Sequence, residues 1–355
     1  MAGSTGNTGA GFSVAGRPVG DGRCFVIAEA GVNHNGDMAL AHLLVDAAAA
    51  AGADAVKFQT FRADRLAAPA APTAEYQRRN AGATDQRAML AALELSEADH
   101  VALIAHCREA GIVFLSSAFD HDSIDLLDRL GVAAFKVPSP DCVNTPYLRR
   151  LAGLGRPVIL STGMCDMQDV GLGVNTLRAG GCEAIALLHC TSCYPAPDDE
   201  LHLAAMRPMG ECFGLPVGYS DHSEGVAVSI AAVALGAAVI EKHLTLDRTL
   251  PGPDHVASIE PDDFAALVRG VRQVERATGR PEKRPQPSER DTRVAARRSV
   301  AAARPLAAGA RLQAEDAVIL RPGGGYPPDA LKYLLGRRLA RDVAAGALLA
   351  PEDFD

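Results

Sequence analysis

The sequence predicts an α/β protein built on a closed (β/α)8 barrel, or TIM barrel, followed by a small second domain. Short apolar runs rich in β-branched residues alternate with helix-like segments eight times. Strands that are apolar along their whole length are typical of a parallel sheet buried on both faces. Eight such units within about 260 residues fit a closed barrel better than an open sheet. After Gly279 the alternation stops, and proline and charge take its place.

The expected strands follow one another at regular intervals along the chain. They cover residues 24–31, 55–60, 113–119, 135–139, 157–163, 184–190, 216–221 and 239–245. Several of the helical segments between them open with Ser or Asp and close with Gly, which are the preferred cap residues. The longest connection, residues 62–96, is a candidate lid or substrate wall.

Outside the barrel we expect less regular structure. Residues 1–20 form either a disordered head or an N-terminal hairpin, and residues 21–279 form the catalytic barrel. Residues 280–292 are rich in proline and charge and predict an extended linker. Residues 293–355 are punctuated by Gly and Pro, which predicts a small, loop-rich domain with only a modest core.

Composition excludes several classes of function. The chain has 355 residues, of which 48% are hydrophobic and 22% charged, as in ordinary soluble domains. A net charge of -8 gives no reason to expect a nucleic-acid partner. No secretory signal and no charge-free apolar run of membrane length are visible, so we expect a cytoplasmic protein with no membrane partner and reduced cysteines. Cys190 and Cys193 have C-x-x-C spacing, but no second pair completes a zinc site.

Polar side chains gather at the carboxyl ends of the expected strands. In a TIM barrel this rim carries the active site, and a buried strand has no structural need of polar side chains there. The residues are Glu29, Lys57, Gln59, Ser117, Lys136, Ser139, Ser161, Thr162, His189, Ser220, His222 and His243. We therefore expect a catalytic site at this end of the barrel.

Two histidines in this group point to a metal. His222 and His243 end two successive strands of one βαβ unit, so their rings can lie side by side. Paired neutral imidazoles can hold one divalent cation and leave positions open for oxygen ligands. A single histidine at a strand end is usually structural, and from the residues alone that reading stays open. The nearby acids Asp221, Glu241 and Asp254 favour the metal site.

Eight ordered motifs resemble those of the sialic acid (N-acetylneuraminate) synthase family, which includes the legionaminate and pseudaminate synthases. They are EAGVNHNG from Glu29, VKFQT from Val56, FKVPS from Phe135, LSTGM from Leu160, LHCTSCYP from Leu188, GYSDH from Gly218, EKH from Glu241 and PGPDH from Pro251. The C-terminal segment resembles the antifreeze-like (SAF, β-clip) domain of these synthases. The similarity extends from about residue 20 to the C-terminus, and it specifies the family much better than the sugar.

The resemblance implies a metal-dependent synthase. It would condense phosphoenolpyruvate with an open-chain acylamino hexose, N-acetylmannosamine or a related sugar. The products would be a nine-carbon 2-keto-3-deoxy sugar acid and phosphate, released by C–O cleavage. Glu29 would take part in proton transfer, while His222 and His243 would hold Mn²⁺ or Mg²⁺.

The resemblance also assigns the binding residues. Phosphoenolpyruvate would be bound by Lys57, Ser117, Lys136, Ser139, Ser192 and Ser220, since its phosphate and carboxylate need cations and hydroxyl donors. The sugar would be bound by Gln59, Asp141, Tyr194, Asp254 and Arg321. Arg321 would reach the acylamino group in the other subunit, which implies a domain-swapped homodimer. Without the resemblance, Arg321 would be an ordinary surface arginine.

Several positions depart from the family pattern and bear on substrate choice. Asp141 stands where several bacterial members have Glu, and Ser192 where some have Asn. Arg297 occupies a region where one bacterial member has an aromatic residue. Pro138 and Pro140 flank Ser139 in place of small residues. None of these changes removes a metal ligand or a phosphate-binding cation, so the reaction class is unaffected.

Three alternative functions remain at this point. The same chemistry could use another sugar or sugar-phosphate aldehyde in a secondary-metabolite pathway. Lys57 or Lys136 could form the Schiff base of an ordinary aldolase. The C-terminal domain could bind carbohydrate or ice beside a barrel that has lost its activity, although the complete set of polar rim residues argues against this.

Overall fold

The computed structural model describes residues 10–68 and 85–355. The chain forms two compact units, Met1–Gly279 and Arg280–Asp355. Within the described residues, no helix has the length and apolar character that a membrane span requires.

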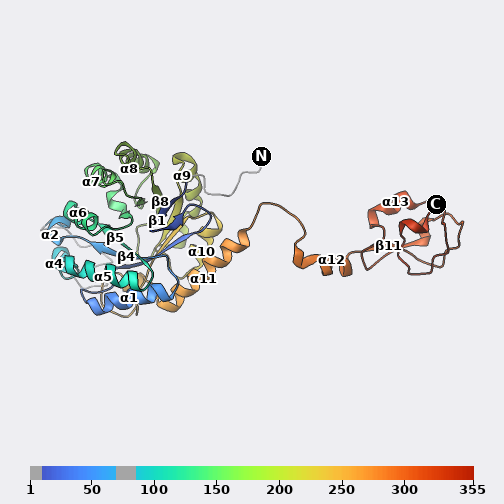
Figure 1. The fold of residues 1–355 in the computed structure, drawn as a ribbon, viewed down its shortest axis with the longest axis horizontal. Helices are drawn as coiled ribbons and strands as arrows, with labels where there is room; N and C mark the ends of the chain where they lie inside the picture. The colour runs from blue at the N-terminus through green and yellow to red at the C-terminus, as the bar shows by residue number, and fades with distance from the viewer. Residues whose placement is uncertain (1–9, 69–84) are drawn as a thin grey trace. The chain divides into compact units, whose positions relative to one another are not determined.

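The first unit is a closed barrel of eight parallel strands, which confirms the predicted TIM barrel (Figure 1). The strands are β3 (Phe25–Gly31), β4 (Ala55–Thr60), β5 (Val113–Ala118), β6 (Phe135–Val137), β7 (Val158–Ser161), β8 (Ile185–Cys190), β9 (Val217–Asp221) and β10 (Val239–His243). Each strand pairs with the next in sequence, and β10 closes the barrel against β3. In this arrangement all eight carboxyl ends open on the same side.

Helices cover the outside of the barrel. They are α1 (Met38–Ala50), α5 (Glu97–Glu109), α6 (His121–Arg129), α7 (Thr145–Ala152), α8 (Met167–Ala179), α9 (Met206–Phe213), α10 (Ala227–Ala234) and α11 (Pro261–Thr278). Local sequence sets several starting points: Ser96 and Asp99 form a capping box at α5, and Asp120 caps α6. Short 3-10 turns occur at η1 (Ser139–Val143), η2 (Asp198–Glu200), η3 (Leu203–Ala205) and η4 (His255–Ala257).

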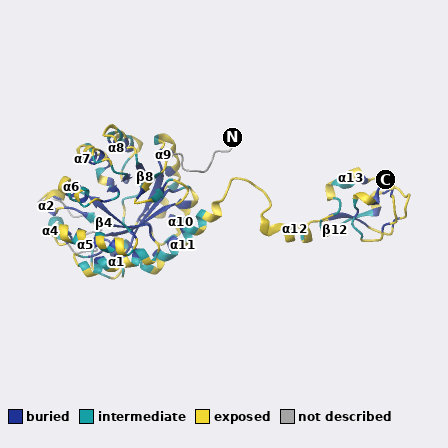
Figure 2. Ribbon diagram, in the orientation of Figure 1, coloured by how far each residue is buried: buried dark blue, intermediate teal, exposed yellow. Residues whose placement is uncertain are grey.

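Two apolar cores hold the barrel together, one inside it and one between the strands and the helices. The barrel strands between these cores are largely buried (Figure 2). The inner core includes Phe25, Leu115 and Ile159, and it also receives Val14 and Val19. These two valines belong to the hairpin β1 (Phe12–Val14) and β2 (Arg17–Val19). Residues 12–19 thus form a hairpin whose apolar side packs onto the barrel interior, whereas residues 1–9 lie outside the described part.

The connection between β4 and α5 carries two short helices in its described parts, α2 (Ala63–Leu66) and α4 (Gln86–Ala91). Phe61 and Leu93 pack there with Val32 in a small apolar cluster. The candidate lid or wall therefore has a folded base, and residues 69–84 of it lie outside the described part.

The second unit is small and loop-rich. Its antiparallel strands β11 (Ser299–Ala302) and β12 (Ala317–Leu320) are accompanied by α12 (Arg290–Ala296) and α13 (Leu331–Leu334). The 3-10 turns are η5 (Pro287–Glu289), η6 (Ala314–Asp316), η7 (Pro328–Ala330) and η8 (Pro351–Asp353). Its own core includes Val300, Leu312 and Leu349. The segment expected to be extended contains η5 and the start of α12, where Gln286 and Glu289 form a capping box.

Candidate active site

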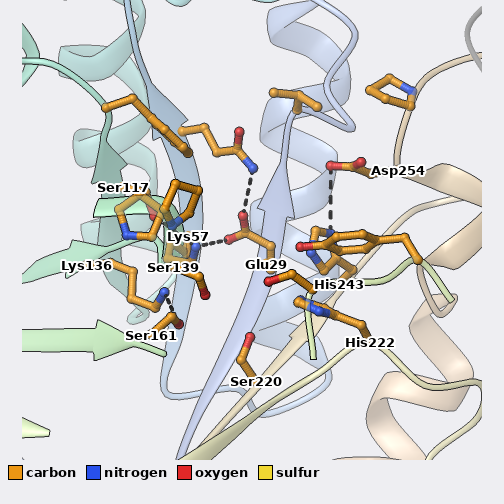
Figure 3. Close-up of a pocket in the computed structure, with 18 of the residues that line it drawn as sticks. Glu29, Lys57, Ser117, Lys136, Ser139, Ser161, Ser220, His222, His243 and Asp254 are labelled. Atoms are coloured by element: carbon orange, nitrogen blue, oxygen red, sulfur yellow. Dashed lines mark hydrogen bonds and ion pairs between the residues drawn. The ribbon is translucent and has the colours of Figure 1, made fainter. Parts of the chain in front are cut away.

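A cavity of about 490 Å³ lies at the carboxyl ends of the barrel strands (Figure 3). It brings together most of the residues that the sequence assigned to the site. Those that line it are Glu29, Lys57, Gln59, Ser117, Lys136, Ser139, Ser192, Tyr194, Ser220, His222, His243 and Asp254. They come from seven different strands or the loops that follow them, which only the closed barrel brings together.

Two ammonium groups lie in the floor of the cavity. Lys57 on β4 and Lys136 on β6 are 3% and 2% exposed. The Nζ of Lys57 lies 2.8 Å from Glu29 Oε2 and donates to Ser117 Oγ at 3.0 Å. The Nζ of Lys136 donates to Ser161 Oγ at 2.7 Å. Buried cations need such partners. The two ammonium groups can also bind an anionic ligand that enters the cavity.

Glu241 on β10 lies between the two lysines. Its carboxylate oxygens are 3.6 Å from the Nζ of Lys57 and 3.6 Å from that of Lys136, and Ser220 Oγ donates to it at 3.1 Å. Burial would raise the pKa of Glu241, but the two ammonium groups outweigh burial and lower it to about 2. Glu241 is therefore ionised and neutralises part of the positive charge of the floor.

The pKa of Glu29 on β3 is shifted in the opposite direction. Burial is the main cause that raises its pKa to about 7; Lys57 opposes the rise and Glu241 adds to it. Gln59 Nε2 donates to Glu29 Oε1 at 3.2 Å. A carboxyl group with a pKa near neutrality can both give and accept a proton at working pH. The geometry thus makes Glu29 a suitable acid or base facing the cavity.

The hydroxyl groups of Ser139 and Ser192 lie close to the backbone of Gly163. Ser139 Oγ accepts from the backbone N–H of Gly163 at 3.0 Å. A Cβ added at Gly163 would overlap Ser192 Oγ and come within 2.9 Å of Ser139 Oγ. Glycine at this position therefore lets the loop after β7 reach the two serines that are expected to bind phosphoenolpyruvate.

The two histidines lie side by side, with ring centroids 5.5 Å apart. Figure 3 shows the two rings at one side of the cavity, with Asp254 next to His243. His222 Nδ1 donates to the Thr191 carbonyl at 2.8 Å, because a carbonyl can only accept, and this leaves the lone pair of Nε2 free for a ligand. Among the described residues, His243 Nδ1 is buried with no hydrogen-bond partner, and Asp254 Oδ2 lies 4.0 Å away.

These features fit a divalent cation. Burial is the main cause that lowers the pKa of His243 well below its usual value, so the ring is neutral as a ligand must be. Within residues 10–68 and 85–355, no three His, Cys, Asp or Glu side chains are grouped closely enough to hold a metal by themselves. The remaining ligands would have to be water or substrate oxygens, which is typical of a catalytic rather than a structural site.

Tyr194 and Asp254 complete this side of the cavity. The Tyr194 ring lies 4.2 Å from that of His222 and 5.7 Å from that of His243, measured between centroids. Burial raises the pKa of Asp254 to about 6, although His222 and Lys57 oppose the shift. Both residues can offer polar atoms to a ligand next to the histidines.

Two of the residues expected to bind sugar do not line the cavity. Asp141 lies on η1, where its carboxylate accepts from Asn144 Nδ2 at 2.8 Å. Its neighbours Pro138 and Pro140 do line the cavity. Arg321 belongs to the second unit, beyond β12.

Sequence reasoning missed several lining residues. Glu241 lines the cavity, and its position two residues before His243, which puts both on the same side of β10, is the sequence signal that indicates this. Ser161, one of the polar residues at the rim, accepts a hydrogen bond from Lys136 Nζ. The described base of the 62–96 connection also provides an apolar wall, consisting of Leu66, Ala67, Met89, Leu90 and Leu93. No sequence signal could place this wall, because the connection lacks the periodicity of a barrel element.

A TIM barrel with buried lysines and paired imidazoles at its catalytic end defines a class of protein: a barrel enzyme that acts on a small anionic substrate. Comparison with known proteins narrows this class. Residues 44–283 match the NeuB family and residues 297–355 match the SAF domain. The chain belongs to the NeuB family, the phosphoenolpyruvate-dependent nonulosonic acid synthases.

Individual relatives agree with this placement over nearly the whole chain. The N,N'-diacetyllegionaminic acid synthase of Legionella pneumophila is 47% identical over 94% of this chain and 95% of its own length. The human N-acetylneuraminate-9-phosphate synthase is 38% identical over 94% and 93%. Among solved structures, the spore coat polysaccharide biosynthesis protein SpsE of Bacillus subtilis has a TM-score of 0.67 and 35% identity, covering 98% of this chain and 99% of that one.

Proposed function

We propose that the protein condenses phosphoenolpyruvate with an open-chain acylamino hexose, N-acetylmannosamine or a relative of it. The products are a nine-carbon 2-keto-3-deoxy sugar acid and phosphate. The observation that carries this proposal is the division of one cavity into a cationic floor with serine hydroxyls and an adjoining pair of imidazoles. The floor suits an enol phosphate, and the imidazoles suit the activation of a carbonyl.

Phosphoenolpyruvate binds on the floor. Lys57 and Lys136 supply positive charge, and the hydroxyls of Ser117, Ser139 and Ser220 supply donors for its phosphate and carboxylate oxygens. Ser192, beside Ser139 at the Gly163 loop, adds a further donor. Without the anion, Glu29 and Glu241 form ion pairs with the two lysines. When phosphoenolpyruvate binds, its negative charge balances the positive charge of the lysines.

His222 and His243 would hold Mn²⁺ or Mg²⁺. A divalent cation held there would supply Lewis acidity for polarising the aldehyde oxygen of the sugar. The chain's own residues keep the two imidazoles in the ligating form: the Thr191 carbonyl fixes one tautomer, and burial keeps the other ring neutral. Gln59, Tyr194 and Asp254 lie where they can orient the sugar hydroxyls.

The reaction forms one C–C bond and breaks one C–O bond. C3 of phosphoenolpyruvate attacks the aldehyde carbon, and the electron-poor C2 that results is captured by water. The C–O bond to the phosphate then breaks, which leaves the 2-keto group. Glu29, with its pKa near 7, accepts one proton of the water and returns it to the former aldehyde oxygen, which becomes a hydroxyl group. The second proton of the water leaves with the phosphate when the keto group forms.

The apolar wall bears on the choice of sugar. Met89, Leu90 and Leu93 offer contact to acetamido or deoxy methyl groups rather than to a phosphate. Among the described lining residues, the lysines of the floor are the only lysines or arginines, and they are assigned to phosphoenolpyruvate. An uncharged, methyl-bearing acceptor is therefore favoured over a sugar phosphate. Arg321 of a second subunit would contact the acylamino group, so the working form is a homodimer.

A screen for phosphate release tests this function. The metal-supplied protein is incubated with phosphoenolpyruvate and either N-acetylmannosamine, its 6-phosphate, a diacetamido trideoxyhexose or a sugar phosphate without an acylamino group. Mass spectrometry should find a product with three carbons more than an uncharged acylamino hexose. Acceptor-independent phosphate release, or turnover only of sugars without an acylamino group, would reject it. Borohydride trapping with pyruvate should label neither Lys57 nor Lys136.

A further inference from the structure

A buried ion pair lies directly beneath the two histidines. Asp221 and Lys242 immediately precede His222 and His243 in the sequence, and they face each other as cross-strand neighbours of β9 and β10. Their charged atoms, Lys242 Nζ and Asp221 Oδ2, are 3.0 Å apart. Both side chains are 0% exposed, and neither residue lines the cavity.

The alternation of side chains along a strand explains why the ion pair does not line the cavity. Ser220 and Glu241 line the cavity, whereas Asp221 and Lys242, one residue further along, belong to the opposite side of their strands. The pair therefore lies between the barrel and its helices, where Ser229 of α10 donates to Asp221 Oδ2. It has no direct access to a bound substrate.

The same network holds the backbone on both sides of His222. Lys242 Nζ donates to the carbonyl of Ser223 at 2.6 Å. The N–H and the hydroxyl of Ser223 donate to Asp221 Oδ1 at 2.9 and 2.6 Å. Residues 221 and 223 are thus both tied to Lys242, the residue that precedes His243. The network links the two histidine positions through the backbone.

A buried ion pair is weak evidence for a role in stability, because desolvating two charges costs about as much as their attraction returns. Apolar residues of similar size would fill the same space. In contrast, a charged and hydrogen-bonded cross-link fixes the relative position of two strands, which an apolar contact does not.

We infer that Asp221 and Lys242 are positioning residues that set the separation and orientation of His222 and His243 for a divalent cation. This inference rests on the proposed metal site and extends it to residues that touch neither metal nor substrate. Residues behind metal ligands typically change metal affinity by about 10- to 100-fold when altered.

The test measures Mn²⁺ binding by titration calorimetry with the full-length, metal-stripped protein. The double variant Asp221→Asn/Lys242→Met removes both charges, keeps the volume and leaves no unpaired charge. Its Kd for Mn²⁺ should rise about tenfold or more. The KM for phosphoenolpyruvate, measured at saturating Mn²⁺, should stay near the wild-type value, because the floor is unaltered.

Arg272→Met is the matched control. It removes the Arg272 partner of Asp54 at the amino end of the barrel, 2.6 Å between charged atoms, and leaves Asp54 paired with Arg17 and Arg23. This control should lower the melting temperature without changing the Kd for Mn²⁺. A purely structural role of Asp221 and Lys242 would give the double variant the same behaviour, and that result would overturn the inference.

Two further variants keep the outcomes distinct. Ser229→Ala removes one donor to Asp221 and serves if the double variant does not fold; it should weaken Mn²⁺ binding about two- to threefold, and an unchanged Kd would contradict the inference. His243→Ala should abolish binding at the site. If the wild type itself binds no Mn²⁺ at this site, the metal assignment fails, and the positioning role fails with it.

Discussion

At the scale of single residues, the cavity floor is a charge cluster that is balanced before substrate arrives. Lys57 and Lys136 are buried cations, which is costly unless partners are present. Glu29 and Glu241 provide these partners, but burial and the neighbouring charges shift their pKa values in opposite directions. One carboxylate therefore stays ionised as a counter-charge, while the other is available for proton transfer.

Gly163 offers a test of the floor that involves no charge. In Gly163→Ala, the added methyl group must displace Ser192 Oγ and Ser139 Oγ, so donors to phosphoenolpyruvate are lost. Loss of about one hydrogen bond to a charged ligand should raise the KM for phosphoenolpyruvate about tenfold. Steady-state kinetics at saturating sugar would measure this.

Gly171→Ala is the control for this prediction. Gly171 lies on α8, and its added methyl group would meet only the Phe213 ring, at 3.6 Å. This variant should keep the wild-type KM. Equal KM values in both variants would show that the serines near Gly163 do not bind phosphoenolpyruvate.

The sequence could predict the members of the cavity that end strands, because strand periodicity decides which side they face. His222, His243 and the two lysines are examples. It could not predict that Asp141 is absent from the cavity lining, because the position of Asp141 depends on the turn η1 and on a hydrogen bond from Asn144. Nor could it show that Glu241 lies between two lysines from strands β4 and β6, because that contact requires the barrel to be closed.

At the scale of elements, the barrel strands and the connections between them behave differently. The eight strands were predictable because each begins with a short apolar run, as burial on both faces requires. The apolar wall formed by α2, α4 and the residues that follow them was not, because short helices in a long connection carry no clear period. In the proposed function, contact with this wall favours one acceptor sugar over another.

A polar substitution in α4 tests the role of the wall. Leu90→Asn should raise the KM for the acylamino hexose several-fold, because a methyl group of the sugar would lose an apolar contact worth about 1 kcal/mol. The KM for phosphoenolpyruvate should not change. Leu43→Asn, at a position on α1 that is 51% exposed, serves as the control and should affect neither value. A rise in the KM for phosphoenolpyruvate alone would show that the wall contacts phosphoenolpyruvate and not the sugar.

At the scale of the whole molecule, the chain consists of a barrel with two cores of its own and a small unit with a third. The change of composition after Gly279 predicted that a second domain follows. The composition of the second unit does not predict which surface it contacts, because a unit with a modest core and exposed arginines can pack against many surfaces. The homodimer in which Arg321 serves the other subunit therefore stays a proposal.

Co-expression of two defective chains tests this arrangement. A His243→Ala chain lacks a metal ligand but has an intact Arg321, and an Arg321→Ala chain has the reverse. If the second unit serves the other subunit, mixed dimers contain one complete site, and about a quarter of wild-type activity should return on random pairing. Activity equal to the average of the two separate variants would show that each chain uses its own second unit.

The most direct measurement of the central claim is metal-dependent phosphate release from phosphoenolpyruvate in the presence of an acylamino hexose. Wild-type protein stripped with EDTA should be inactive and should recover on addition of Mn²⁺ or Mg²⁺, with one phosphate released for each sugar acid formed. His222→Ala and His243→Ala should remain folded by circular dichroism and should not recover. Full activity of either variant after EDTA treatment would contradict the account.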